Sequence, residues 1–148
     1  MRVVPVESKQ LQPRPPVAPA TPDPAGTTPP TLRHRLHIQP HLLAGSGHRR
    51  VPTDPYVRRF WTAALGPGAV ADLLRLIRAA QRERSLPRPE HLSDLIRVGL
   101  AGHAEAGVWV AASIPDVPPA DVRRLPPYLR REHHHWLTRE QNATTLDL

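Results

Sequence analysis

Apolar residues follow a helical spacing through much of the chain after residue 53. The first run starts behind Asp54 and Pro55, a good helix N-cap followed by a good first helical residue. Its apolar positions fall at i, i+3, i+4, i+7 and i+8, and they are Val57, Phe60, Trp61, Ala64 and Leu65. A Gly-Pro-Gly sequence at residues 66–68 ends the run, so the pattern predicts a first helix over about residues 54–65.

The same spacing predicts further helices. A second helix over residues 69–84 turns an apolar face inward, made by Val70, Leu73, Leu74, Ile77 and Ala80. A third, over residues 89–99, lines one face with Leu92, Leu95, Ile96 and Leu100. After a short helical segment at residues 120–125, a last helix over residues 127–137 gathers Leu129, His133, Trp136 and Leu137 on one face.

Between the third and the later helices the pattern changes from helical spacing to alternation. The stretch "LAGHAEAGVWVAAS" places Val108 and Val110 on either side of Trp109, with Gly107 near a turn. We therefore expect a short β-hairpin there. The predicted fold class is mainly α: a small helical domain with one hairpin over residues 54–138, followed by a frayed C-terminus over residues 139–148.

The first third of the chain has a different composition. Residues 1–31 hold nine of the 20 prolines, and residues 32–53 hold apolar residues interrupted by Pro40 and by a Gly-Ser-Gly sequence. We expect residues 1–53 to form a disordered, proline-rich, basic tail and linker in front of the helical domain.

Charge and composition narrow the function classes. The net charge is +7, but residues 1–53 hold seven basic and two acidic groups, whereas residues 54–148 hold thirteen and eleven. The absence of cysteine excludes disulfides, thiolate metal sites and cysteine catalysis.

No apolar run reaches about 18 residues, so we expect no membrane contact and a cytoplasmic location. The 19 arginines against one lysine indicate GC-rich coding, typical of GC-rich bacteria.

An arginine stripe follows the predicted second helix. Arg75, Arg78 and Arg82 are spaced at i, i+3 and i+7, which places them along one helix face. Arginine forks bind phosphate oxygens in pairs, so the stripe is a candidate nucleic-acid contact. The alternative is a solvated helix face with Asp72 and Glu83 as local partners.

The stretch "LIRVGLAGHAEAGVWVAAS" resembles the end of a winged-helix domain, with a helix, a short strand, a glycine turn and a strand carrying tryptophan. The resemblance covers about 25 residues. It implies that the third helix and the hairpin tip touch nucleic acid through His91, Ser93, Arg97 and His103. A loop with two prolines before the helix, and the acids Glu90 and Asp94 on it, differ from that pattern. The alternative is a helix and hairpin that only close the core.

The sequence shows little that indicates catalysis or metal binding. His133, His134 and His135 are consecutive, so on a helix they point in different directions and cannot converge on one ion. No HExxH, glycine-rich phosphate loop or GxSxG sequence occurs. We therefore expect no catalytic residue, no metal site and no cofactor.

Two function classes follow from these patterns. The first is a non-enzymatic nucleic-acid-associated protein that binds phosphates through arginine-rich helix faces and the basic tail, with weak sequence preference. The second is a protein–protein interaction adaptor without nucleic-acid contact. A continuous arginine face on the folded domain favours the first, and scattered charges around an exposed apolar patch favour the second.

Overall fold

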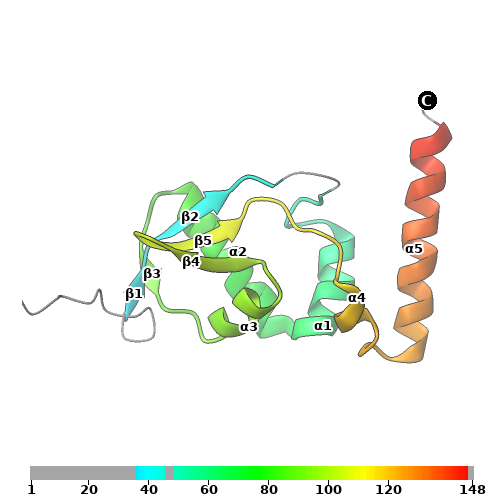
Figure 1. Cartoon of the computed structure of the whole chain (residues 1–148), viewed down its shortest axis with the longest axis horizontal. Coiled ribbons are helices and arrows are strands. Elements are labelled where there is room, and N and C mark those ends of the chain that lie inside the picture. Colours follow the sequence, from blue (N-terminus) through cyan, green and yellow to red (C-terminus); the bar gives the residue numbers. More distant parts are fainter. Residues whose placement is uncertain (1–35, 46–48, 147–148) are drawn as a thin grey trace, which may run out of the picture.

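The structure is a computed structural model, and it describes residues 36–45 and 49–146. Strands gather at one end, and the last helix stands upright at the other (Figure 1). The elements in chain order are β1 (His37–Ile38), β2 (Pro40–Leu43), η2 (Val57–Trp61), α1 (Thr62–Leu65), α2 (Pro67–Gln81), β3 (Leu86–Pro87), α3 (Leu92–Arg97), β4 (Ala101–Ala104), β5 (Gly107–Ala111), α4 (Pro119–Val122) and α5 (Pro127–Leu146).

The expectation of a mainly α fold is wrong. Of the residues that the structure describes, 51% are helical and 18% lie in strands that form two small sheets, so the fold is an α+β mixture. The predicted hairpin is present, because β4 pairs with β5 in antiparallel register. However, β2 pairs with the other side of β5 in parallel register, and β1 pairs with β3. The hairpin is therefore part of a three-stranded sheet, with β5 in the middle, and not a free wing.

Strand β2 lies in the segment that the sequence assigned to a linker. Pro40 was interpreted as a breaker of any long helix, and no strand was predicted there. It is the first residue of β2, an edge strand, where a residue without a backbone N–H is tolerated. The pairing is anchored where Val108 N–H donates to Gln39 O at 3.1 Å and Ala112 N–H donates to Leu43 O at 3.0 Å. A Cβ on Gly107 would lie 2.2 Å from Gln39 O, so this close approach of two backbones requires glycine. Of the tail and linker expected over residues 1–53, residues 1–35 and 46–48 lie outside the described residues.

The predicted N-cap of the first helix, Asp54, is confirmed. Asp54 Oδ1 accepts the backbone N–H of Tyr56 at 2.7 Å, which is the N-cap bond that the sequence predicted. The chain then forms a π-helical turn, η2, before the α-helical turn α1. Val57, Phe60 and Trp61 are completely buried, so the predicted apolar stripe does face the core.

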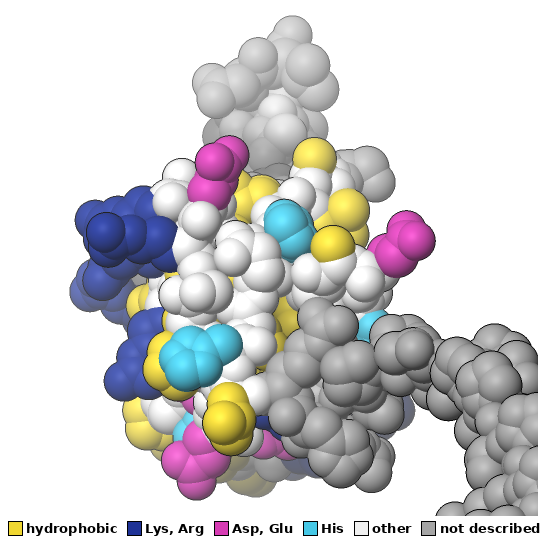
Figure 2. All heavy atoms as spheres, turned by 90° about the vertical axis from the view of Figure 1, so that its left-hand side faces the viewer, with side chains coloured by type: hydrophobic (Ala, Val, Ile, Leu, Met, Phe, Trp, Pro, Cys, Tyr) yellow, Lys and Arg dark blue, Asp and Glu magenta, His cyan; other side chains and the backbone are white. Residues whose placement is uncertain are grey.

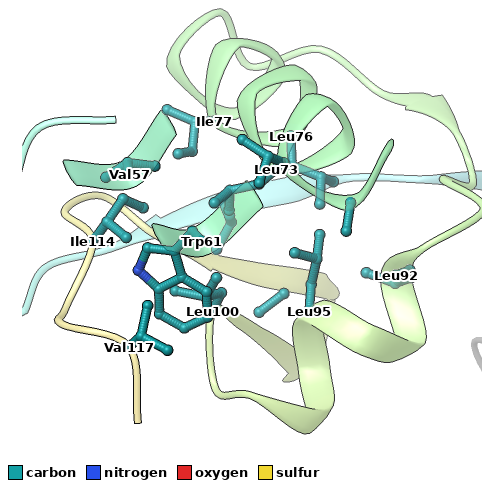
Figure 3. Packing of buried hydrophobic residues seen from close by; sticks show 14 of the residues in the cluster. Val57, Trp61, Leu73, Leu76, Ile77, Leu92, Leu95, Leu100, Ile114 and Val117 are labelled. Atoms are coloured by element: carbon teal, nitrogen blue, oxygen red, sulfur yellow. The ribbon is translucent and has the colours of Figure 1, made fainter. Parts of the chain in front are cut away.

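The core lies between α2, α3, η2 and the three-stranded sheet (Figure 3). Leu73 and Ile77 of α2 were predicted to face inward, and both are buried. Leu76 is also fully buried, although it lay outside the predicted stripe. The indole of Trp61 lies near Leu100, Ile114 and Val117 in Figure 3, and its Nε1–H donates to Pro115 O at 2.9 Å. A buried tryptophan with a satisfied N–H fixes the segment after β5 onto the core.

A buried polar network holds α5 to the rest of the protein. Arg50 is 4% exposed, and its guanidinium lies 3.8 Å above the ring of Tyr56. It donates to Asp116 Oδ1 at 3.0 Å and to both carboxylate oxygens of Glu140, one of them at 2.6 Å. The helix therefore continues, with a structural role, past residue 139, where the sequence predicted fraying.

His133 closes the same network from α5. The Val117 N–H donates to the Tyr56 hydroxyl oxygen at 2.9 Å, and that hydroxyl lies 2.7 Å from His133 Nε2. With its oxygen accepting from Val117, the hydroxyl has its own proton to donate to Nε2 of a neutral His133 ring. The prediction that His133 faces inward beside Leu129 is confirmed, since both residues are buried. We call Arg50, Tyr56, Asp116, His133 and Glu140 the Arg50 network.

In the described part of the chain, no single helix is long and apolar enough to cross a membrane. Residues Val57–Leu65 and Pro67–Gln81 pass that test only as a pair, and the pair is bent by 119°. Its apolar side chains supply much of the core.

Candidate nucleic-acid interface

The predicted arginine stripe forms one exposed face of α2. Arg75, Arg78 and Arg82 are all exposed, and Arg84 from the following turn joins them. With Ala79 and Ser85 these four side chains line a shallow depression of about 190 Å³. Figure 2 shows dark-blue Lys and Arg side chains gathered along the left-hand edge of the molecule in that view. We call Arg75, Arg78, Arg82 and Arg84 the arginine face.

The face follows from how α2 ends. Glu83 has a φ of 52°, a left-handed conformation that usually favours glycine after a helix. Its N–H donates to Ala80 O at 3.2 Å, and the next N–H, of Arg84, donates to Ala79 O at 2.9 Å. These two bonds form a Schellman motif, which turns the chain back over the last helical turn. This turn places Arg84 beside the helical arginines. Arg84 was expected to point outward from the second helix, but the turn itself was not predicted, because no glycine marks the position.

The arginine face is short of negative partners. Arg75 NH1 donates to Asp72 Oδ1 at 3.2 Å, but the side chain of Arg75 stays 71% exposed. Within residues 36–45 and 49–146, no carboxylate lies within ion-pair distance of Arg78, Arg82 or Arg84. Of the two local partners that the sequence suggested, Asp72 thus engages one arginine and Glu83 none. The face keeps most of its positive charge available to solvent.

His91 is joined to the arginine face through one buried carboxylate. Asp72 is 5% exposed, and its Oδ2 accepts the His91 N–H at 3.1 Å and lies 3.0 Å from His91 Nδ1. Its Oδ1 accepts the hydrogen bond from Arg75 NH1 described above. The structure therefore brings together two predicted contact residues that the sequence had placed in separate groups. Asp72 itself was missed as their common support, because the partner segment comes 19 residues later.

The other predicted contact residues lie apart from this face. Arg97 NH1 donates to Asp121 Oδ1 of α4 at 3.4 Å, so its charge is already paired. Ser93 on α3 and His103 on β4 are exposed. In the described part of the chain no hydrogen bond or ion pair connects these three to the arginine face.

An ion pair lines a second cleft, between η2 and α5. Arg59 donates to both oxygens of Glu132, at 3.1 and 2.9 Å, and this hydrogen bonding lowers the pKa of the Glu132 carboxyl. The cleft has a volume of about 370 Å³ and is also lined by Arg58 and Trp136. Because Arg59 and Glu132 neutralise each other, Arg58 is, among the described residues, the one lining arginine left for an anionic ligand, and the cleft is a weaker candidate than the arginine face.

Metal ligands do not gather in the described regions: no three His, Asp or Glu side chains come together there in a way that could hold an ion. His134 and His135 have ring centres 6.1 Å apart on the outer side of α5, and His133 points inward.

The chain matches no protein-family model, no curated protein and no solved structure. We therefore infer function from the geometry of the described residues.

Proposed function

We propose that this protein is a non-enzymatic nucleic-acid-associated protein that binds the phosphate backbone through the arginine face. The observation that supports this most is the lack of a carboxylate near Arg78, Arg82 and Arg84 among the described residues. Arginine side chains that are not used inside the protein keep their five N–H donors for phosphate oxygens.

The spacing of the face suits a nucleic-acid strand. Arg75 and Arg82 are seven residues apart on a helix that rises about 1.5 Å per residue, so they span about 10 Å. A strand of duplex DNA rises about 3.4 Å per nucleotide, so the face covers about three nucleotides. The lining of the face contains no aromatic side chain to stack on a base. Binding through phosphates alone carries little sequence information, so we expect weak sequence preference.

The test is a titration of the full chain against fluorescent duplex and single-stranded oligonucleotides at several salt concentrations. A double variant, Arg78→Ala with Arg82→Ala, should weaken binding to all sequences alike. It should also reduce the slope of log affinity against log salt by about two, since two phosphate contacts are lost.

The matched control is Arg130→Ala with Arg131→Ala. These two arginines are exposed on α5 and have no ion-pair partner among the described residues, so the control removes the same charge from another place. Equal weakening by both double variants would mean that net charge, and not the arginine face, drives binding. Absence of binding at low salt would remove the proposal.

One observation favours the second candidate, a protein-interaction adaptor. Leu36, Leu42, Leu43 and Val51 are 85%, 42%, 49% and 62% exposed, and two of them lie on the edge strand β2. Exposed apolar side chains on an unpaired strand edge are typical of protein contacts. If oligonucleotides do not bind, the replacement of Leu42 and Leu43 by serine, followed by affinity capture with wild type as reference, tests this candidate.

A further inference from the structure

A cleft of about 550 Å³ adjoins the arginine face and shares Arg75 with it. One wall is formed by α2, and the other by the segment that enters α3. We call it the His91 cleft, and its lining is Gly68, Ala71, Asp72, Arg75, Pro87, Arg88, Pro89, Glu90 and His91. Basic residues thus line the cleft on both walls: Arg75 on the helix, and Arg88 and His91 on the segment.

Asp72 orients two of these groups at once. Its buried carboxylate uses one oxygen for Arg75 and the other for the backbone and ring of His91. Because Nδ1 of His91 faces Asp72, the ring nitrogen left for a ligand is Nε2. Arg75 uses one N–H for Asp72 and keeps the other guanidinium donors on a side chain that is 71% exposed. The donors are therefore held in place before any ligand arrives.

The position of the imidazole also depends on Gly68. A Cβ at residue 68 would lie 2.6 Å from Cε1 of His91 and 3.0 Å from its Nε2. The ring therefore rests directly on the first turn of α2, where only glycine leaves room. On the opposite wall, the backbone N–H of Arg88 donates to Leu36 O at 2.9 Å, which fixes this segment against the start of the described chain.

We propose that the His91 cleft binds a phosphomonoester, either the terminal phosphate of a nucleic-acid strand or that of a small molecule. A terminal phosphate carries a charge of about −1.5 to −2 near neutral pH, which is more negative than that of a backbone diester. A chain end can also enter a concave site, whereas a phosphate in the middle of a strand has nucleotides on both sides. Arg75 supplies paired N–H donors to its oxygens, and Arg88 adds positive charge. Nε2 of His91 donates a hydrogen bond to a phosphate oxygen when it carries a proton, and accepts a hydrogen bond from a phosphate hydroxyl when it does not.

Glu90 is the acidic group that opposes this ligand. It lines the cleft and is exposed, whereas the charge of Asp72 is already engaged by Arg75 and His91. In total charge, Arg75 and Arg88 offset Asp72 and Glu90, so the case for an anion rests on the oriented donors of Arg75 and on the ring of His91, and not on net charge.

The experiment compares one single-stranded oligonucleotide with a 5′-phosphate, a 5′-hydroxyl or a 3′-phosphate, by fluorescence anisotropy with the full chain. Inorganic phosphate and a nucleoside monophosphate, measured by calorimetry, provide the small-molecule arm. We expect a terminal phosphate to tighten oligonucleotide binding about tenfold, since it adds charge-assisted hydrogen bonds. In its nucleic-acid form this inference rests on the proposed function, and the small-molecule arm does not.

The deciding variant is His91→Asn. Its side-chain amide can still donate to Asp72, but it has no atom in the place of Nε2, so the advantage of the terminal phosphate should disappear. His103→Asn, an exposed histidine on β4, is the matched control and should keep the advantage. Thermal unfolding checks that each variant folds, and Arg88→Gln replaces His91→Asn if that variant does not.

The outcomes separate the two proposals. Equal binding of phosphorylated and hydroxyl strands, without small-molecule binding, overturns the phosphomonoester site and leaves the proposed function standing. Binding of inorganic phosphate or the mononucleotide to wild type but not to the variant, without any oligonucleotide binding, supports the site and rejects the proposed function. Absence of binding in both arms, or an advantage that the variant keeps, overturns the site.

Discussion

Arg50 and Arg82 are the same residue type in opposite surroundings. The side chain of Arg50 is 3% exposed and is surrounded by an aromatic ring and two carboxylates. Arg82 is exposed on the arginine face and has no ion-pair partner in the described part of the chain. A buried arginine is needed by the fold, because its partners depend on it, whereas a hydrated one can be removed without structural loss. The same contrast separates the Arg50 network from the arginine face as a whole.

The largest expected effect is on the Arg50 network. Arg50→Met should lower the free energy of unfolding by about 2–4 kcal/mol, because it leaves Glu140 and Asp116 without their shared partner. The side chains of Asp116 and Glu140 are 39% and 35% exposed, so water can hydrate both carboxylates in the variant. This hydration limits the loss of stability. Denaturant unfolding measures it. A loss under about 1 kcal/mol would mean that α5 is held by its apolar contacts alone.

A smaller loss in the free energy of unfolding is expected when the Arg50 network keeps its charged groups and loses only the Tyr56 hydroxyl. Tyr56→Phe keeps the ring under Arg50 and removes the group between Val117 N–H and His133 Nε2. Two buried polar groups then lack partners, so we expect a loss of about 1–3 kcal/mol in denaturant unfolding. Burial raises the pKa of Tyr56 to about 12, so the hydroxyl keeps its proton at the neutral pH of the measurement. Tyr128→Phe, at an exposed position of α5, is the control and should change little.

The network should also make stability depend on pH. Burial lowers the pKa of His133 below its ordinary value, so the unfolded chain binds this proton more readily than the folded one. Its contribution is therefore complete above the ordinary histidine pKa of about 6.5, and it is lost as pH falls through the lower folded pKa.

Unfolding titrations between pH 7.5 and 5 compare wild type with two variants. His133→Gln keeps an acceptor for Tyr56 but does not titrate, so it should lose less stability in acid than wild type. His134→Gln, on the exposed side of α5, should behave like wild type. An unchanged acid loss in His133→Gln would assign the pH dependence to other groups.

The smallest effect is expected on the arginine face. Arg82→Met should change the free energy of unfolding by no more than about 0.5 kcal/mol, as is usual for exposed positions without partners. It should still weaken oligonucleotide binding. If its stability loss approaches that of Arg50→Met, the contrast between the two regions fails, and Arg82 has a structural role that its exposure does not indicate.

How far the sequence predicts this molecule depends on how local each feature is. Amphipathic spacing is local, so the inner face of η2 and most of that of α2 were predicted correctly, as with Trp61 and Leu73, although Leu76 was missed. Strand β2 was missed because its partner, β5, is distant in sequence, and because Pro40 is tolerated only at an edge that the sequence does not reveal. The fold class was wrong for this reason.

The candidate site divides in the same way. The exposure of Arg75, Arg78 and Arg82 follows from helical period alone. The shared contact of Arg75 and His91 with Asp72 does not follow from the helical period, because it depends on how the segment before α3 packs on α2. The expected contact of Arg97 with nucleic acid stays a prediction, but its ion pair with Asp121 could not be predicted, because only the placement of α4 supplies that partner. Nucleic-acid binding itself stays a prediction.

The Arg50 network has a consequence for the order of folding during synthesis. Its hydrogen bonds join residues 66, 77 and 90 positions apart, so they cannot form until nearly the whole chain has left the ribosome. Arg50 must stay hydrated until then, and the apolar side of η2 stays uncovered where α5 later packs. Contacts between distant segments slow folding, since the loop must be closed before any contact forms. Docking of α5 is thus the last step, and a chain released before residue 140 carries an arginine at residue 50 with half of its salt bridges missing.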